Sequence, residues 1–213
     1  SVFSNYIKKK YNYKIVAFFN YCLISAPLNF NLLNKFRWNF GNIFNLKTFA
    51  VYRSFNTENI FRPTITKTIK EKANLYFHKN FKKIRNKKDV VNIRVKNIPI
   101  GEVLYDSYIR LKKEPTIDIF SEDFKNYYIN FVELTFFWIR FLKKNDVKGI
   151  VVSHPVYVYS LPTRVAIAIS KKISCYIATP YAVVKVNRNT IDGGLLGCVK
   201  NYKKDFDKLP SKI

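Results

Sequence analysis

One stretch of the chain constrains its fold more than any other: residues 147–170, VKGIVVSHPVYVYSLPTRVAIAIS. It opens with a β-branched apolar run over residues 147–152, which predicts a strand buried on both faces. A polar loop follows, and then an amphipathic helix over residues 161–172. A second apolar run, residues 174–178, predicts the next strand. Strand, helix and strand in this order are typical of a βαβ unit, so we expect the two strands to be parallel neighbours.

Periodic patterns predict further elements on the N-terminal side of this unit. Apolar residues at helical spacing predict helices over residues 64–88, 100–112 and 121–144. In the last helix Ser121 is the expected N-cap, and Phe131, Trp138 and Leu142 form a buried stripe opposite exposed Lys125 and Lys143. Short apolar or alternating runs predict strands over residues 13–21, 49–55 and 89–95. The sequence therefore indicates an α/β fold with a mainly parallel sheet flanked by helices.

Positive charge dominates the composition. The chain carries 38 Lys and Arg against 14 Asp and Glu, a formal net charge of +24. Such a surplus favours anionic partners, namely nucleic acid, anionic lipid head groups or phosphorylated substrates. The cations are spread along the chain, with local clusters such as Lys82-Lys83 and Lys87-Lys88. A solvated surface shaped by A/T-rich coding explains the same counts, so the charge alone does not choose among these partners.

Cysteine spacing and glycine motifs exclude several kinds of chemistry. Cys22, Cys175 and Cys198 show neither a metal-ligand spacing nor close pairs, so we expect no metal site and no disulfide framework, as in a reducing cytosol. Cys22 and Cys175 lie in apolar runs typical of buried thiols. The chain has no GxGxxG motif and no P-loop, and its Gly193-Gly194 pair is expected to form a turn. No apolar run is long enough to predict a transmembrane helix.

His154 is one of two histidines in the chain, and it follows the strand predicted at residues 147–152. Loops at the carboxyl ends of strands in an open α/β sheet carry ligand sites, so His154, with Ser153 and Tyr157, is a candidate for a general base or for a contact to a sugar or phosphate. A structural histidine that caps the next helix or bonds a carbonyl is the alternative.

A second group of candidates lies on the helix predicted over residues 100–112. Tyr105, Asp106 and Arg110 can shape a binding cleft, but the spacing of Asp106 and Arg110 favours an ordinary ion pair between them. Asp118 is a candidate to cap or anchor the following helix. Arg164, in the first turn of the helix after the His154 loop, is either a surface arginine or a partner for an anionic group.

Two stretches resemble a known family, and they occur in the family's order. Residues 100–119, IGEVLYDSYIRLKKEPTIDI, and residues 147–180, VKGIVVSHPVYVYSLPTRVAIAISKKISCYIATP, are similar to segments of bacterial surface-polysaccharide biosynthesis proteins of the capsule type. These proteins are glycosyltransferase-like and have the GT-B architecture of two Rossmann-like domains. Glu102 stands where the family carries Asp. The resemblance covers roughly the second half of the chain.

The resemblance implies a domain organisation. Residues 1–12 would form a basic N-terminal segment, residues 13–190 a Rossmann-like acceptor-side domain that is one half of a GT-B fold, and residues 191–213 a connection toward a missing C-terminal domain. The chain begins with Ser1 and contains no Met, so we expect a fragment or a processed product. The nucleotide-sugar donor would bind the missing domain. We therefore expect no cofactor in this domain and no activity of the isolated chain.

The same resemblance implies a function. The full-length protein would transfer a sugar from a nucleotide-sugar to a glycan or lipid-linked acceptor, in the cytoplasm and peripherally at the inner face of the cell membrane, where positive charge suits anionic lipid. His154 would be the catalytic base. The expected acceptor-binding residues are Tyr105, Asp106, Arg110, Ser153, Tyr157 and Arg164.

Two other functions remain open. A non-enzymatic nucleic-acid-binding protein, for example a ribosome-associated one, would also use the net charge of +24. The dispersed cations and the lack of an RNA-binding motif count against it. A scaffold for polysaccharide assembly that keeps the fold without activity is the third possibility.

Overall fold

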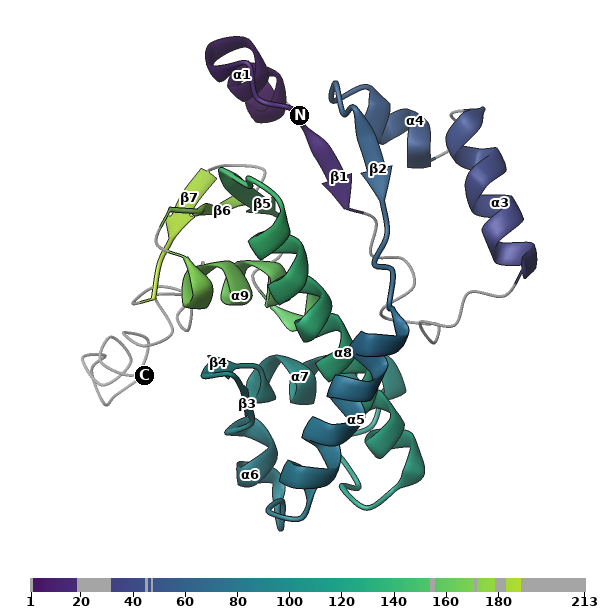
Figure 1. Cartoon of the computed structure of the whole chain (residues 1–213), viewed down its shortest axis with the longest axis vertical. Coiled ribbons are helices and arrows are strands. Elements are labelled where there is room, and N and C mark those ends of the chain that lie inside the picture. The colour runs from purple at the N-terminus through teal and green to yellow at the C-terminus, as the bar shows by residue number, and fades with distance from the viewer. Residues whose placement is uncertain are drawn as a thin grey trace, which may run out of the picture. The chain divides into compact units, whose positions relative to one another are not determined.

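The computed structural model describes residues 2–18, 32–44, 46, 48–153, 156–170, 172–178 and 183–188. The chain divides into two compact units, Ser1–Thr64 and Ile65–Ile213. Each unit combines helices with short strands (Figure 1). The fold is therefore mixed α/β. The domain limits predicted from the sequence, after residues 12 and 190, stay predictions, because the second lies outside the described residues.

The first unit is built around a pair of parallel strands. Its elements are α1 (Val2–Tyr11), β1 (Val16–Phe18), α3 (Leu32–Ile43), α4 (Thr48–Arg53) and β2 (Asn59–Phe61). β1 pairs with β2 in parallel, with Val16 opposite Asn59 and Phe18 opposite Phe61. The rings of Phe18 and Phe61 lie 5.2 Å apart, so this cross-strand pair also contributes apolar contact.

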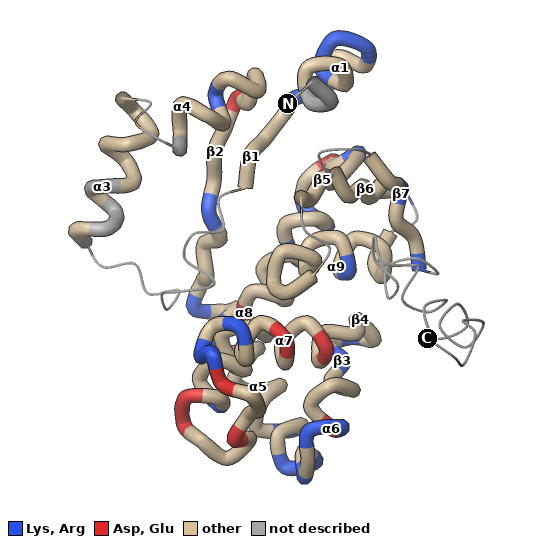
Figure 2. Tube along the Cα trace, turned by 180° about the vertical axis from the view of Figure 1, so that it is seen from behind, with Lys and Arg blue, Asp and Glu red and all other residues tan. Residues whose placement is uncertain are grey.

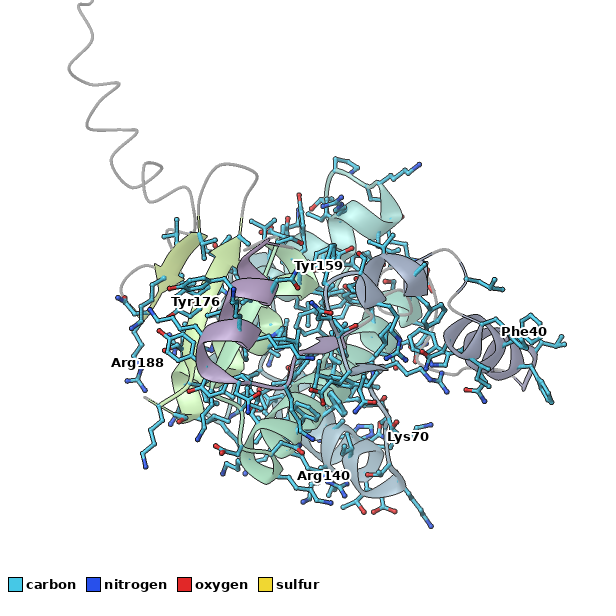
Figure 3. All side chains as sticks on the ribbon, turned by 90° about the horizontal axis from the view of Figure 1, so that it is seen from above. Phe40, Lys70, Arg140, Tyr159, Tyr176 and Arg188 are labelled. Carbon is cyan, nitrogen blue, oxygen red and sulfur yellow. The ribbon has the colours of Figure 1, made fainter. Side chains whose placement is uncertain are left out.

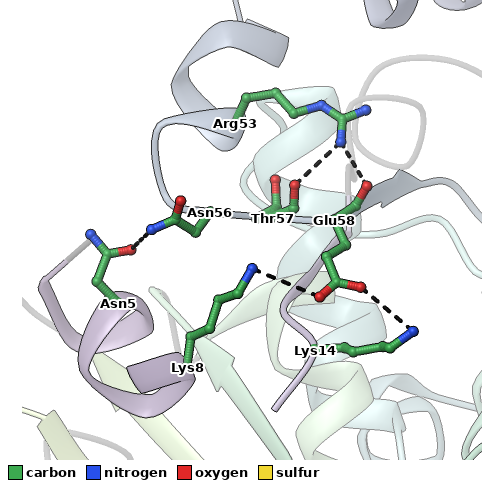
Figure 4. A network of polar contacts seen from close by, with 7 residues as sticks. All are labelled: Asn5, Lys8, Lys14, Arg53, Asn56, Thr57 and Glu58. Atoms are coloured by element: carbon green, nitrogen blue, oxygen red, sulfur yellow. Dashed lines mark hydrogen bonds and ion pairs between the residues drawn. The ribbon is translucent and has the colours of Figure 1, made fainter. Parts of the chain in front are cut away.

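Polar contacts of Arg53 and Glu58 connect four elements of this unit (Figure 4). The Arg53 guanidinium donates to the carbonyl oxygens of Thr57, at 3.2 Å, and Glu58, at 2.6 Å, and so joins the end of α4 to the segment that leads into β2. The Glu58 carboxylate lies 3.8 Å from both Lys8 of α1 and Lys14, which precedes β1. These contacts hold α1 and β1 beside β2.

The second unit is organised by α8 (Glu122–Lys144), its longest helix. α8 packs against α5 (Lys67–Phe81), α7 (Gly101–Lys112) and α9 (Leu161–Ile169). The short helix α6 (Lys87–Val91) packs on α7. Helices 100–112 and 121–144 are confirmed with nearly the predicted limits, whereas the first and last predicted helices are shorter than expected because α5 ends at Phe81 and α9 at Ile169.

The expected stripe on α8 is confirmed. Phe131, Trp138 and Leu142 are all buried. Lys143 is exposed, but the Lys125 side chain is only 28% exposed, because it lies along the helix and pairs with Glu122 at 2.7 Å. The prediction for Lys125 was therefore only partly right.

The start of α8 follows from two side chains. The Ser121 hydroxyl accepts a hydrogen bond from the Phe124 backbone N–H, as expected for an N-cap. The Asp118 carboxylate accepts from the Phe120 N–H at 3.0 Å, and the Asp118 carbonyl accepts from the Ser121 hydroxyl at 2.8 Å. Asp118 thus anchors the turn that leads into α8, one of the roles predicted for it.

The predicted βαβ unit is present. β5 (Gly149–Val152) and β6 (Ser174–Ala178) are parallel neighbours, with Gly149 opposite Ser174. The connection between them contains the 3-10 helix η1 (Tyr157–Ser160) and α9. A third strand, β7 (Val183–Val186), pairs with β6 in the antiparallel sense and was not predicted. The sheet is therefore small and mixed rather than mainly parallel.

β5 is not buried on both faces, which corrects the prediction from its β-branched run. Val151 is 49% exposed, and the remaining residues of the strand are exposed or half-buried. Among the described residues β5 has only β6 as a strand neighbour, so it forms an edge of the sheet. The Ile and Val side chains here reflect strand propensity rather than deep burial.

Of two other predicted strands, the one over residues 49–55 is wrong, and the one over residues 89–95 is right only at its end. Residues 49–55 form the rest of α4 and a turn, and within α4 the partly buried positions Phe49, Tyr52 and Arg53 follow helical spacing. Residues 89–95 form the end of α6 and then β3 (Arg94–Val95), which pairs with β4 (Ile98–Pro99). A capping box between Asn86 and Asp89 turns this segment into a helix.

We expect Trp138→Ala to lower the free energy of unfolding by about 3–5 kcal/mol, because it removes a large side chain from the core. Chemical denaturation followed by circular dichroism measures this loss. Leu75→Ala on α5 is the control, since Leu75 is 71% exposed and its truncation should change the stability little. A loss below about 1 kcal/mol for Trp138→Ala would show that the stripe is not the core of this unit.

Candidate functional site

The two sequence stretches that resemble the polysaccharide family meet in the second unit. α7, from the first stretch, packs against η1, and its Glu102 forms an ion pair with Arg164 of α9; η1 and α9 both belong to the second stretch. Gly101 sets the position of α7, because a Cβ atom there would lie 2.0 Å from the carbonyl oxygen of Val90 and 2.4 Å from that of Val91. Only glycine allows the start of α7 to approach α6 so closely.

The side chains of α7 divide between the core and a more exposed face. Ser107 is buried and donates to the Val103 carbonyl at 2.5 Å, and Tyr108 is buried edge-on against Phe124 at 5.4 Å. Glu102, Asp106 and Arg110 follow one another at intervals of four residues, so they share a face of the helix. Their contacts show that this face is directed toward η1 and α9.

An ion pair between Glu102 and Arg164 joins α7 to α9. Arg164 Nη2 donates a hydrogen bond to Glu102 Oε2 at 3.1 Å, and the two residues are 62 positions apart in the sequence. The Arg164 side chain is only 6% exposed, while that of Glu102 is 52% exposed. Arg164 is therefore a buried cation that meets an anionic group, rather than a surface arginine. Because an isolated buried cation is strongly unfavourable, the Glu102 carboxylate stabilises the whole junction.

Asp106 lies in the electrostatic field of this pair. Partial burial raises the pKa of its carboxyl above the ordinary value, the negative charge of Glu102 raises it further, and the positive charge of Arg164 opposes both effects. The predicted ion pair between Asp106 and Arg110 is wrong, because no such pair forms in the described part of the chain. Asp106 thus remains available to accept a hydrogen bond from a ligand hydroxyl.

Arg110 instead stacks on Tyr157. The guanidinium carbon lies 4.5 Å from the centre of the Tyr157 ring, a cation–π contact between α7 and η1. Tyr157 has a φ of 57°, in the left-handed region that non-glycine residues seldom adopt. Such strained residues persist where the surrounding structure holds them, and they gather at ligand sites. Arg110 and Tyr157 were both predicted site residues, and the structure brings them together.

Two of the other predicted site residues, Tyr105 and Ser153, are not part of this cluster. Tyr105 lines a depression of about 380 Å³ beside α6, together with Lys87, Lys88 and Asn92. Ser153 is exposed just beyond the end of β5. His154, the predicted catalytic base, lies outside the described residues. The site that the structure describes therefore consists of Glu102, Asp106, Arg110, Tyr157 and Arg164.

Sequence reasoning missed two features of this region. Glu102 was not predicted as a site residue, although its spacing from Asp106 and Arg110 placed it on the same helix face. A larger depression, of about 560 Å³, lies between the α6 segment and the segment before α8, and its lining residues are Arg85, Asn86, Lys87, Lys88, Ile117 and Ile119. The dense run of cations at residues 82–88 was its only signal in the sequence.

The structure bears on one of the thiol predictions. Cys175 is buried and has no disulfide, and burial raises the pKa of its thiol to about 12, so it remains a protonated apolar side chain at neutral pH. Cys22 and Cys198 lie outside the described residues, as does the expected turn at Gly193. Within the described ranges, no group of three or more His, Cys, Asp and Glu residues is placed to hold a metal ion.

Comparison of the chain with protein-family models, with curated proteins and with solved structures gave no match. The likeness to surface-polysaccharide biosynthesis proteins therefore rests on the two stretches alone, and membership of that family stays a prediction. In the part of the chain that the structure describes, no helix is both long and apolar enough to cross a membrane.

We expect Asp106→Asn to stabilise the protein slightly at neutral pH. Because the folded-state pKa of Asp106 is raised, the folded protein binds its proton more tightly than the unfolded chain. The gain from Asn should therefore be absent below the ordinary Asp pKa of about 3.9, should grow as the pH rises through the folded-state pKa, and should then stay constant. Solvent screening of this partly exposed group keeps the gain below about 1 kcal/mol.

Urea unfolding of both proteins across this pH range measures the difference. Asp146→Asn is the matched control, because the Asp146 side chain is 82% exposed and its replacement should change the stability little at any pH. A loss of stability at neutral pH in Asp106→Asn, with none in the control, would show that the Asp106 carboxylate is held by favourable contacts instead.

Proposed function

We propose that this chain is the N-terminal, acceptor-side domain of a GT-B-like glycosyltransferase of surface-polysaccharide biosynthesis. The full-length protein would transfer a sugar from a nucleotide-sugar to a glycan or a lipid-linked acceptor. In this proposal the domain is Rossmann-like, the donor binds a second domain, and the work of this chain is to hold the acceptor. It acts in the cytoplasm, peripherally at the inner face of the cell membrane.

One observation carries the proposal. The two stretches with the family resemblance are separated in sequence by the whole of α8, yet α7 packs against η1 and is joined to α9 by an ion pair. The contacts between them are made by residues of the two motifs themselves, the Glu102–Arg164 ion pair and the Arg110–Tyr157 stack. A shared site for one ligand is an economical reason for both motifs.

The cluster has suitable chemistry for a sugar acceptor. Asp106 offers a partly exposed carboxylate whose raised pKa makes it a good hydrogen-bond acceptor for hydroxyl groups. Arg164 and Glu102 position α7 and do not need to touch the ligand. Arg110 and Tyr157 supply a cation and an aromatic ring at the edge of the cluster. His154 would remove the proton from the attacking hydroxyl, which requires a base within hydrogen-bond reach of it.

Acceptor binding by the 213-residue chain tests the proposal. The probe is a short polyprenyl diphosphate that carries one hexose, titrated in detergent and followed by saturation-transfer NMR of the sugar protons. We expect saturable binding, weakened about tenfold or more by Asp106→Asn, because a buried or shielded hydroxyl loses its charged acceptor. Asp146→Asn is again the matched control and should bind as the parent chain does.

Three results would count against this function. The first is the absence of any saturable binding to the sugar. The second is an equal loss in Asp106→Asn and Asp146→Asn, which would indicate general electrostatics. The third is binding of the polyprenyl diphosphate without its hexose at the same affinity. Hydrolysis of a nucleotide-sugar by this chain alone would separately refute the assignment of the donor to another domain.

A nucleic-acid-binding function is the alternative, and one observation favours it. Six exposed cations lie within ten residues at the end of α5 and the start of α6. Figure 2 shows Lys and Arg positions in blue near α6. We call this the α5–α6 basic segment, and it consists of Lys79, Lys82, Lys83, Arg85, Lys87 and Lys88. Among the described residues no carboxylate forms an ion pair with any of them.

Salt dependence separates this alternative from the transferase. If the α5–α6 basic segment binds RNA, the affinity for a single-stranded oligonucleotide should fall linearly with the logarithm of the salt concentration, with a slope of about −0.7 per phosphate contact. Lys87→Gln/Lys88→Gln should then flatten the slope by roughly 1 to 1.5. Lys143→Gln/Lys144→Gln, an exposed pair at the C-terminal end of α8, should not differ from the parent chain.

A further inference from the structure

α3 in the first unit carries a row of exposed apolar side chains. Leu33, Phe36, Phe40, Ile43 and Phe44 are each between 57% and 74% exposed. Their positions follow helical spacing along one side of α3 and one residue beyond its end. Phe40, labelled in Figure 3, points away from the other elements of its unit, and its ring lies 4.4 Å from that of Phe44. We call these five residues the α3 stripe.

The opposite side of α3 already packs within the unit. The Trp38 ring meets the Phe49 ring edge-on at 4.9 Å, and Gly41 is buried so close to Phe49 that a Cβ atom would lie 2.8 Å from Phe49 Cε2. Asn42 accepts a hydrogen bond from Arg53 of α4 at 3.2 Å. The helix is therefore fixed by one face, and the α3 stripe is its second apolar face.

The charge of the unit indicates what can cover this face. Residues 1–64 contain nine Lys and Arg, and Glu58 is their only acidic residue. Within the helix and the segment that follows, Lys35, Arg37 and Lys47 occur without any acid. A helix with Phe, Leu and Ile on one side and with cations but no acids in its sequence is typical of helices that lie in the interface of an anionic bilayer.

We propose that α3 is a membrane-docking helix that inserts the α3 stripe into the surface of an anionic lipid bilayer. The inserted side chains would leave water, and the cations of the unit would approach the lipid phosphates. This inference adds a specific docking element to the peripheral location in the proposed function. It stands on the apolar face and the charge of the first unit, and it does not require that the protein transfers sugars.

Other occupants fit these observations less well. A second copy of the chain would bring nine further cations toward the first nine, and their repulsion opposes such a dimer. Nucleic acid suits the cations and can stack on Phe36 or Phe40, but Leu33 and Ile43 would gain nothing from stacking. A bilayer accommodates both the aliphatic and the aromatic members of the α3 stripe and the positive charge around them.

Co-sedimentation of the 213-residue chain with vesicles tests the proposal. One vesicle type is pure phosphatidylcholine, and the other contains about one third phosphatidylglycerol. We expect clear preference for the anionic vesicles and a loss of affinity of about tenfold or more in Phe36→Ser/Phe40→Ser, since two Phe side chains no longer leave water. Leu75→Ser/Phe120→Ser is the matched control, because these residues are 71% and 63% exposed in the second unit, and it should bind as the parent does.

A second measurement reports insertion of the α3 stripe directly and does not rely on a variant that weakens vesicle binding. The indole introduced by Phe40→Trp should shift its emission to shorter wavelength with anionic vesicles and should be quenched by lipids that carry a quencher in the acyl chain. The parent chain, measured in the same way, gives the background from its own two tryptophans. Circular dichroism of each variant checks that the fold is kept. Equal vesicle binding by Phe36→Ser/Phe40→Ser and the parent, or an added emission in Phe40→Trp that vesicles leave unchanged, would overturn the proposal.

Self-association and RNA binding are further outcomes. If analytical ultracentrifugation shows that the parent chain is a dimer and that Phe36→Ser/Phe40→Ser is a monomer, the α3 stripe is a protein interface and the proposal fails. If that variant weakens RNA binding and leaves vesicle binding unchanged, the proposal fails in favour of nucleic acid. A chain that binds vesicles through α3 but binds no hexose-bearing acceptor would refute the transferase function alone, so the two proposals fail separately.

Discussion

Burial of one stripe on α8 holds the second unit together. Eleven residues of this helix are buried, and among them Phe124 and Tyr128 contact aromatic rings of neighbouring helices. Phe77 of α5 meets Tyr128 at 5.4 Å, and Tyr108 of α7 meets Phe124 at the same distance. Because α5, α7 and α9 all pack on this stripe, its position determines which face of α7 is directed toward α9. The candidate site depends on that orientation.

The parts of the fold that could be predicted are those whose signals are repeated over many residues. α8 repeats its apolar period over 23 residues and has a serine at its start, so its type and limits follow from the sequence. β6 is a short apolar run between polar ends, and its limits were right. α4 has six residues and α6 has five, which is too short for the helical period of apolar residues to be recognised in the sequence. Their helical form depends on side-chain bonds from Arg53 and on the Asn86–Asp89 capping box.

Four of the five residues of the described site were predicted from the sequence, all but Glu102, but the pairs that they form were not. Helical spacing placed Asp106 and Arg110 on one face of α7, and it also suggested an ion pair between them that does not form. Arg164 and Tyr157, from the distant second stretch, compete for these neighbours and change the outcome. Whether Arg164 is buried depends on how α9 packs against α8 and β5, which no local pattern contains. Tertiary contacts therefore decide the electrostatics of a site of which the sequence indicated every member except Glu102.

The positive charge and the α3 stripe share a physical explanation. Neither contributes to the folded state of the isolated chain, since a net charge of +24 is self-repelling and exposed Phe and Leu side chains order water around them. Both unfavourable terms diminish at the same kind of surface, one that is anionic at its boundary and apolar beneath. RNA would relieve the repulsion and could cover Phe36 or Phe40 by stacking, but it would leave Leu33 and Ile43 exposed, and an apolar protein partner would relieve only the exposure. An anionic bilayer would relieve both, which is why we propose a membrane in preference to either alternative.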